Sequence, residues 1–277
     1  MLRLRPKSLG ELVEQVLQAP HGLRYIAGGT DLTIRIHLDG LDLHLADITS
    51  LEDLKGISLY PHGYRVGSTV TFSRISASNH LPGGLRAMAS KVGSPQIRSR
   101  GTMGGNVGNL SPAGDAIPML MALNATMEVL QFQEEAVIPG SIPMGDMKPG
   151  PFGVLPGPRD LITGFSIPRW DFSHFGKVGS RRTVTISKLS VGCALDRGGK
   201  RCRLYLGAVG SLPIRCGEAE DAIVNLSGRE LLAELPAILS RAVERAIPNR
   251  ASMPYKREAV KALGLELAQD LVSEGGV

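Results

Sequence analysis

Cysteine is scarce in this sequence. Its 277 residues include three cysteines, and no two of them are spaced as C-x-x-C. Three thiols cannot supply a four-cysteine iron–sulfur site, and they cannot complete a zinc site without histidine. The small odd number also argues against a secreted domain held together by disulfides, which carries its cysteines in pairs. We therefore expect a cytoplasmic location, and we expect Cys193 to be an ordinary core residue within its apolar run.

Long apolar runs and metal-binding histidine patterns are also missing. No stretch of 18 consecutive apolar residues occurs, so no transmembrane helix is expected. After the basic start MLRLRPK, polar residues stand where a signal peptide needs its apolar stretch. The six histidines show no spacing such as H-x-x-x-H, and no obvious nucleophile or acid–base pair is present. We therefore predict neither a metal site nor a catalytic residue.

Aromatic residues make up only 4% of the chain, and the lysines and arginines are scattered. A net charge of +5 and a pI of about 9.2 predict attraction to anionic ligands or acidic partner surfaces, but not a nucleic-acid surface. The spacing G-x-G occurs nowhere, which excludes the Rossmann dinucleotide fingerprint, and no phosphate-binding loop of the G-x-x-x-x-G-K-[ST] type is present.

Two glycine-rich stretches, AGGTD at 27–31 and GTMGGNVGN at 101–109, are the most unusual feature that is present. Glycine reaches positive φ at little cost and lets backbone N–H groups approach a ligand closely. Consecutive N–H groups in such turns form an anion-binding nest, so two nests suit an extended anion with two phosphates. The alternative is that each stretch is a turn that merely connects two elements.

Hydrophobic periodicity and turn residues predict most of the secondary structure. A capping box formed by Ser8 and Glu11 opens a helix over 8–19. The segment 133–160, rich in proline and glycine, is predicted to be an irregular connection. The other predicted strands are 23–27, 43–48, 57–60, 63–72, 125–132, 161–168, 183–195 and 200–210, and the other helices are 51–54, 85–92, 116–123, 218–225, 229–247 and 255–272. A domain boundary is expected near residue 173.

Several motifs then occur in one order along nearly the whole chain: AGGTD, RVGSTVTF, SPQIRSRGTMGGNVGNLSPAGDAIPMLMAL, LITGFSIP, KVGSRR and ISKLSVGCAL. In this order they resemble the FAD-binding medium subunit of the molybdenum hydroxylases, the group of xanthine dehydrogenase, carbon monoxide dehydrogenase and aldehyde oxidoreductase. The resemblance implies an α+β fold. Residues 1–172 would be a FAD-binding domain of two α/β subdomains, similar to the PCMH or vanillyl-alcohol-oxidase type, with the flavin between them. Residues 173–277 would be a smaller domain of antiparallel sheet plus helices.

The same resemblance implies which residues bind FAD. The two glycine-rich stretches would hold the pyrophosphate, Asp115 would contact ribityl or ribose hydroxyls, and the remaining residues would lie near the flavin. The implied FAD-binding residues are Tyr25, Ile26, Ala27, Gly28, Gly29, Thr30, Asp31, Leu32, Val92, Thr102, Met103, Gly104, Gly105, Asn106, Asp115, Ile162, Lys177 and Lys188. Simpler roles remain open for some of them: helix caps for Asp31 and Asp115, and exposed lysines for Lys177 and Lys188.

The implied function is electron transfer within a multi-subunit oxidoreductase. A large subunit would hydroxylate the substrate at a molybdenum cofactor, and a small subunit with two [2Fe–2S] clusters would relay electrons to FAD on this chain. FAD would pass them to NAD⁺ or another acceptor, in a heterotrimer that is itself expected to dimerise. Two alternatives remain: a stand-alone flavin oxidoreductase, and a flavin-free assembly or maturation scaffold of the same fold.

Overall fold

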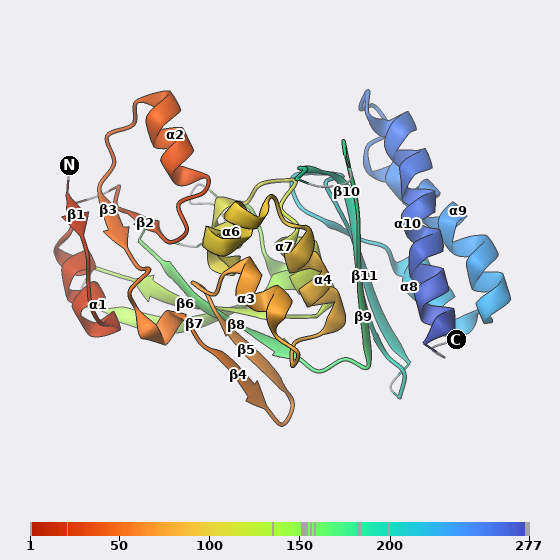
Figure 1. Ribbon diagram of the computed structural model, residues 1–277, viewed down its shortest axis with the longest axis horizontal. Coiled ribbons are helices and arrows are strands. Elements are labelled where there is room, and N and C mark those ends of the chain that lie inside the picture. The colour runs from red at the N-terminus through yellow and green to blue at the C-terminus, as the bar shows by residue number, and fades with distance from the viewer. Residues whose placement is uncertain are drawn as a thin grey trace. The chain divides into compact units, whose positions relative to one another are not determined.

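The computed structural model describes residues 2–20, 22–134, 136–150, 155, 157, 159–181, 184–198 and 200–274. They form two compact units, drawn in Figure 1 and described here one at a time. The first unit combines Met1–Ile75, Pro95–Leu110 and Ala125–Pro168, and the second combines Ser76–Ser94, Ser111–Asn124 and Arg169–Val277. Helices and antiparallel sheets occur together, which confirms the predicted α+β class. The division into continuous domains at residue 173 stays a prediction.

The N-terminal part of the first unit is a small parallel sheet in the order β1-β3-β2, with helix α1 (Leu9–Gln18) packed on it. Its strands are β1 (Arg3–Leu4), β2 (Arg24–Ile26) and β3 (Leu45–Asp47). Leu12 and Val16 of α1 are fully buried, and the Ser8 hydroxyl accepts a hydrogen bond from the Glu11 amide at 3.1 Å. The Glu11 carboxylate accepts from the Lys7 amide at 2.7 Å, one residue before the one that a strict capping box would use.

The first unit also contains an antiparallel sheet in the order β4-β5-β8-β6-β7, with a 3₁₀ turn, η1 (Glu52–Leu54), leading into it. The predicted hairpin is confirmed by the pairing of Tyr60 with Gly63. Its second strand was predicted to run to residue 72, but it ends at Gly67, and helix α3 (Phe72–Ala77) begins at Phe72. The strands are β4 (Ile57–Tyr60), β5 (Gly63–Gly67), β6 (Thr126–Phe132), β7 (Val137–Pro143) and β8 (Leu161–Pro168).

Strand β7 lies within the segment that was predicted to be irregular. It pairs antiparallel with β6 over its whole length, from Phe132↔Val137 to Thr126↔Pro143, and η2 (Met144–Asp146) follows it. Proline cannot donate to a ladder, but β7 is an edge strand, where one side of the backbone has no neighbouring strand. The prediction was wrong here because proline content does not reveal whether a strand is central or at an edge. The rest of that segment includes 151–154, 156 and 158, which lie outside the described residues.

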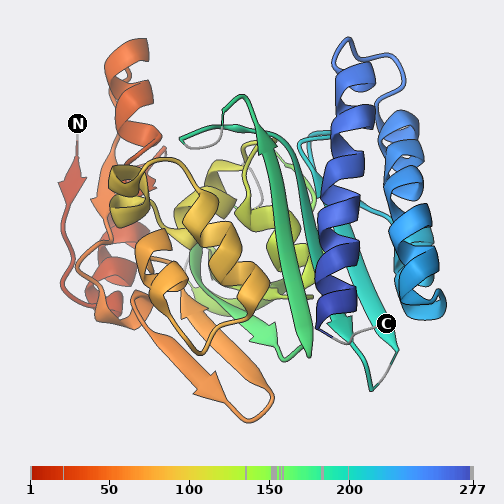
Figure 2. The same cartoon turned by 45° about the vertical axis from the view of Figure 1, so that its right-hand side comes forward.

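The second unit is a sheet in the order β12-β11-β10-β9 with helices on both faces (Figures 1 and 2). Helices α4 (Gly83–Lys91) and α7 (Ala116–Ala122) cover one face; α8 (Gly217–Asn225), α9 (Gly228–Ala246) and α10 (Met253–Ser273) cover the other. The strands are β9 (Phe172–Gly179), β10 (Ser187–Asp196), β11 (Arg201–Gly207) and β12 (Ile214–Arg215). The three predicted C-terminal helices and the β10–β11 hairpin are confirmed.

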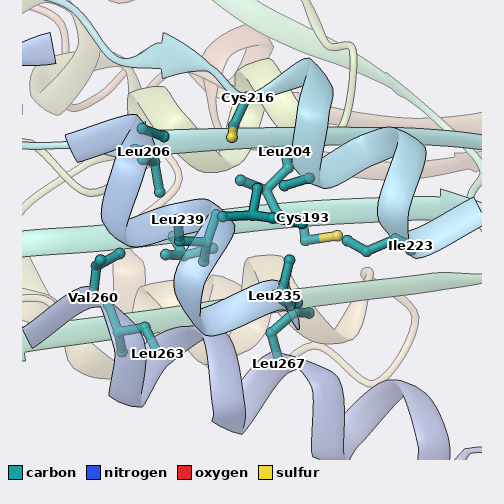
Figure 3. Close-up of a cluster of buried hydrophobic side chains, with 14 of the residues drawn as sticks. Cys193, Leu204, Leu206, Cys216, Ile223, Leu235, Leu239, Val260, Leu263 and Leu267 are labelled. Atoms are coloured by element: carbon teal, nitrogen blue, oxygen red, sulfur yellow. The ribbon is translucent and has the colours of Figure 1, made fainter. Parts of the chain in front are cut away.

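The residues of strand β10 face the two helical layers alternately. Leu189, Val191 and Cys193 belong to the core shared with α8, α9 and α10, part of which Figure 3 draws. Cys193 is fully buried, which confirms its predicted role. Gly192 faces the other way: a Cβ there would lie 2.9 Å from the carbonyl oxygen of Pro118 in α7. A bare glycine backbone therefore lets α7 lie directly on the sheet.

His174 of β9 is a buried titratable group in this unit. Its Nδ1 lies 2.7 Å from the Asp270 carboxylate of α10, and its side chain is 6% exposed. Its Nε2 has no hydrogen-bond partner within the described part of the chain. Burial lowers the pKa of His174 below 6.5, and the nearby Asp270 carboxylate only partly opposes that effect.

The second unit should therefore lose stability as the pH falls below about 6.5. In that range the unfolded chain takes up a proton at His174 before the folded chain does, so the free energy of unfolding decreases by up to about 1.4 kcal/mol per pH unit. His174→Asn should remove this slope. Urea unfolding from pH 8 to pH 5 measures it, followed by the fluorescence of Trp170, the chain's single tryptophan, which lies in this unit. An unchanged slope in the variant would assign the acid sensitivity to other groups.

Within the described residues, no helix is long and apolar enough to cross a membrane. The same residues contain no group of three or more histidine, cysteine, aspartate or glutamate side chains that could hold a metal ion.

Candidate functional site

The first glycine-rich stretch connects β2 to helix α2 (Leu32–Asp39) in the first unit. Gly29 has φ +70°, in the left-handed region that glycine adopts without strain, and its carbonyl accepts a hydrogen bond from the Thr33 hydroxyl. The backbone amides of residues 28–32 donate to no acceptor in the described part of the chain. A run of unpaired, partly exposed N–H groups is what an anion-binding nest requires.

The second glycine-rich stretch is a helix start and not the turn that was predicted. Helix α6 (Met103–Asn109) begins after Thr102, whose hydroxyl accepts from the Gly105 amide at 3.1 Å. The other amides of the first turn are also used: Met103 donates to Val70, Gly104 to Ser68 and Asn106 to Thr102, at 2.9–3.1 Å. This stretch therefore contributes a close-packed backbone surface, and its amides are bonded within the protein.

The two glycine-rich stretches touch through bare backbone. A Cβ on Gly28 would lie 2.0 Å from the carbonyl oxygen of Arg100, the residue before the second stretch. A Cβ on Gly104 would lie 2.6 Å from the Cβ of Ser68, at the end of β5. Only glycine fits at either position, so the chain brings together two stretches about 70 residues apart in sequence, with no side chain between them.

Three other predicted residues of the first unit are also located. A Cβ on Gly108 of α6 would lie 3.6 Å from Cδ1 of Ile162, so Ile162 lies beside the second stretch. The Tyr25 hydroxyl donates to the Arg159 carbonyl oxygen at 2.5 Å, and burial raises the pKa of Tyr25 above its usual value. Asp31 occupies the N-cap position of α2, but its side chain makes no capping hydrogen bond. Asp31 therefore stands where a helix cap would stand, but its side chain does not cap the helix.

Asp115 is the centre of the second unit's polar cluster. It occupies the N-cap position of α7 without a side-chain capping bond. Its carboxylate accepts from the Lys177 ammonium of β9 at 2.6 Å and from the Ser187 hydroxyl of β10. The Asp115 and Lys177 side chains are 5% and 6% exposed, so Lys177 is not the exposed lysine of the simpler alternative. Burial raises the pKa of Asp115, while the Lys177 ammonium and the Ser187 hydroxyl oppose that rise.

Lys91 and Lys177 connect this cluster to the end of α4. The Lys177 ammonium also donates to the Lys91 carbonyl oxygen at 3.0 Å, and the Lys91 ammonium donates to the carbonyl oxygen of Phe175 at 3.1 Å. Val92 directly follows as the C-cap residue of α4, and therefore lies next to this bonded backbone. Lys188 points elsewhere: its ammonium lies 5.0 Å from the ring centroid of Tyr255 in α10.

Ser187 was not singled out by the sequence. It stands next to Lys188 in the motif ISK, and serine in a strand is unremarkable as sequence. Its hydrogen bond to Asp115 joins residues 72 positions apart, which no local pattern encodes.

Comparison with known proteins identifies the family to which the chain belongs. Residues 3–170 match the family described as "FAD binding domain in molybdopterin dehydrogenase". The chain is 31% identical over 298 positions to the nicotinate dehydrogenase FAD-subunit of Eubacterium barkeri, covering 98% of this chain and 96% of that protein. It is 28% identical over 290 positions to the xanthine dehydrogenase FAD-binding subunit of Escherichia coli O157:H7, with the same coverage.

A solved structure shares the fold. A chain of the reconstituted CO dehydrogenase from Oligotropha carboxidovorans superimposes with a TM-score of 0.81 at 22% identity, over 96% of this chain and 95% of that one.

Proposed function

Because the chain belongs to the family of FAD-binding domains of molybdopterin dehydrogenases, we propose that it is the electron-transfer subunit of a multi-subunit molybdenum hydroxylase. Its cofactor is FAD, and its class is that of the xanthine and carbon monoxide dehydrogenases, which are oxidoreductases. The observation that carries the proposal is the run of amides at 28–32, which donate to no acceptor among the described residues, with Gly28 against the backbone of Arg100.

The residues present fit FAD. A pyrophosphate needs several N–H donors and close approach, and the amides of residues 28–32 are unpaired at a turn whose glycines carry no side chains. A sugar-like hydroxyl needs a buried acceptor, and the Asp115 carboxylate has lone pairs beyond the two that Lys177 and Ser187 use. The donor set and the acceptor are therefore both of the kind that FAD requires.

We propose contacts with FAD for residues of each unit taken by itself. In the first unit the backbone of the first glycine-rich stretch binds the pyrophosphate, and the second stretch with Ile162 packs against the cofactor. In the second unit Asp115 accepts from a hydroxyl group, and Lys177 supplies positive charge. The proposed contact residues are Tyr25, Ile26, Ala27, Gly28, Gly29, Thr30, Asp31, Leu32, Val92, Thr102, Met103, Gly104, Gly105, Asn106, Asp115, Ile162, Lys177 and Lys188.

Bound FAD supplies the redox chemistry, because it accepts and donates electrons singly or in pairs. The residues of this chain bind and orient it, and the Lys177 ammonium favours negative charge nearby. We propose that electrons come from [2Fe–2S] clusters of a small subunit, which receives them from a molybdenum-containing large subunit. NAD⁺ or another acceptor would remove them.

The proposed assembly is a heterotrimer that dimerises, located in the cytoplasm. The support for a reducing compartment is that the three cysteines, Cys193, Cys202 and Cys216, are buried as free thiols.

Native purification of the tagged chain from its own cells tests this proposal. We expect FAD, iron and molybdenum in the purified complex, together with two further subunits, and FAD released on denaturation. A complex without flavin would favour the assembly or maturation scaffold. An isolated chain that holds FAD and turns over a substrate without partners would favour the stand-alone flavin oxidoreductase.

A further inference from the structure

The Asp115 carboxylate is held by two donors from neighbouring strands. The Lys177 ammonium of β9 bonds Oδ2 at 2.6 Å, and the Ser187 hydroxyl of β10 bonds Oδ1. The Asp115 and Ser187 residues are 4% and 5% exposed. Two donors on different oxygens fix the plane of the carboxylate, whereas Lys177 alone would leave it free to rotate about χ2.

A β-bulge decides which residue of β10 reaches Asp115. The pairing of β10 with β9 runs from Leu189↔Val178 to Ser187↔Gly179, so Lys188 is the extra residue. Gly192 of β10 faces α7, and in a regular strand residues 190 and 188 would face the same way. The bulge breaks this alternation: Ser187 takes the place beside Asp115, and Lys188 extends to Tyr255 of α10.

The consequence is chemical. A regular strand would place the Lys188 ammonium beside a carboxylate that already bonds Lys177, and this second ammonium would compete with a ligand hydroxyl for the remaining lone pairs. The bulge supplies a neutral hydroxyl, which orients Oδ1 and adds no charge. The charged groups around Asp115 are then Lys177 from β9 and Lys91 from α4.

We propose that Ser187 is a positioning residue that holds the Asp115 carboxylate as the acceptor for a hydroxyl group of FAD. This inference rests on the proposed function and goes beyond it by assigning a role to a residue that does not itself contact the cofactor. It also explains the role of the bulge at Lys188, because the bulge determines which residue of β10 donates a hydrogen bond to Asp115.

Ser187→Ala in the purified complex is the first test. After removal of FAD, we expect it to rebind roughly tenfold more weakly, the size typical of losing one hydrogen bond to a charged group. The Ser187 hydroxyl lowers the pKa of Asp115, so its removal raises that pKa, and protonated Asp115 is a weaker acceptor than the carboxylate. The pH at which FAD affinity falls off on acidification should therefore move upward. Ser187→Thr, which keeps the hydroxyl, should restore both properties.

Ser190→Ala is the matched control, because Ser190 is also a buried serine of β10, 1% exposed. It should leave FAD affinity and its pH dependence unchanged. If Ser187→Ala does not fold, Ser187→Cys fills the space with a larger atom that is a weaker donor, and it should show the same upward movement. A Ser187→Ala complex with unchanged affinity and pH dependence would overturn the inference, as would a loss that Ser187→Thr does not restore. Failure of the proposed function looks different, because the unsubstituted complex would then hold no FAD.

Discussion

Replacing Gly28 by alanine is expected to weaken FAD binding by roughly five- to 150-fold. The new Cβ would lie 2.0 Å from the Arg100 carbonyl oxygen and 2.7 Å from its carbon, and both atoms belong to the backbone, which cannot turn aside as a side chain can. Overpacking of this kind costs about 1–3 kcal/mol, and each 1.4 kcal/mol is tenfold in affinity. We expect the clash to displace the first stretch from Arg100, so that FAD binding must restore the contact at this cost.

The measurement is the dissociation constant of FAD, taken from flavin fluorescence on rebinding to the flavin-free complex. Gly10→Ala is the control in the same unit, because a Cβ there would meet only the Ser8 hydroxyl at 3.9 Å. It should leave affinity unchanged and add about 1 kcal/mol of helix stability at most. Full affinity in Gly28→Ala would mean that FAD does not require the close approach of Gly28 and Arg100.

Gly104 is a less informative position than Gly28. Its added Cβ would lie within 3.0 Å of the Cβ, Cα and carbonyl oxygen of Ser68. These atoms form the surface at the end of β5 on which α6 packs. A bulky residue there displaces the helix whether or not FAD binds nearby. Loss of flavin from a Gly104 variant would therefore report on folding as much as on cofactor contact.

Replacing Lys177 by methionine should cause the largest loss of stability in the second unit, about 3–5 kcal/mol, as expected when one partner of a buried ion pair is removed. Asp115 would then be a buried carboxyl group that has lost its ammonium partner. Because burial already raises the pKa of Asp115 above 3.8, the variant should be least impaired at low pH. As the pH rises from about 4, the unfolded chain releases its proton first, so the free energy of unfolding falls until the folded carboxyl also ionises.

Urea unfolding at several pH values, followed by Trp170 fluorescence, measures this effect. Asp115→Asn combined with Lys177→Met should be more stable than Lys177→Met alone at pH 8, because the double variant buries no unpaired charge. Lys188→Met is the control lysine: its exposed contact with Tyr255 should contribute about 0.5–1 kcal/mol. Equal losses for Lys177→Met and Lys188→Met would show that the buried pair with Asp115 is not special.

Sequence patterns predicted the elements whose signals are local. The helix 8–19, the three C-terminal helices and the hairpins predicted at 57–72 and 183–210 each combine periodicity with capping or turn residues. The structure contains them, with the hairpin strands shortened to 57–67 and 187–207. The structure also contains α3 (Phe72–Ala77), α5 (Pro95–Arg100) and α6, which were missed. For α6 the reason is physical: two adjacent glycines disfavour a helix by about 1 kcal/mol each, and contact with Ser68 overrides that preference.

For the candidate site, the sequence predicted which residues matter but not how they are bonded. Motif order identified the glycine-rich stretches, Asp115 and Lys177 as residues of interest. What the sequence could not reveal is how they are bonded: the amides of the second stretch are occupied, and Asp115 bonds Lys177 and Ser187, 62 and 72 residues away. Long-range pairs of this kind arise from strand register, and a one-residue bulge changes which side chain takes part.

The second unit's interleaved composition has a consequence for how the chain is made. Its sheet is formed by residues from 172 onward, but α4 and α7, which cover the face of Gly192, are synthesised about 100 and 70 residues before Gly192. During synthesis these two helices leave the ribosome well before the sheet that they cover has been made. Their apolar faces therefore stay uncovered by the sheet until its strands have been synthesised. Contacts between residues so far apart close large loops, so the second unit cannot complete its folding until the C-terminal strands have been made. A chain cut before residue 173 or begun there would leave one layer without its other half.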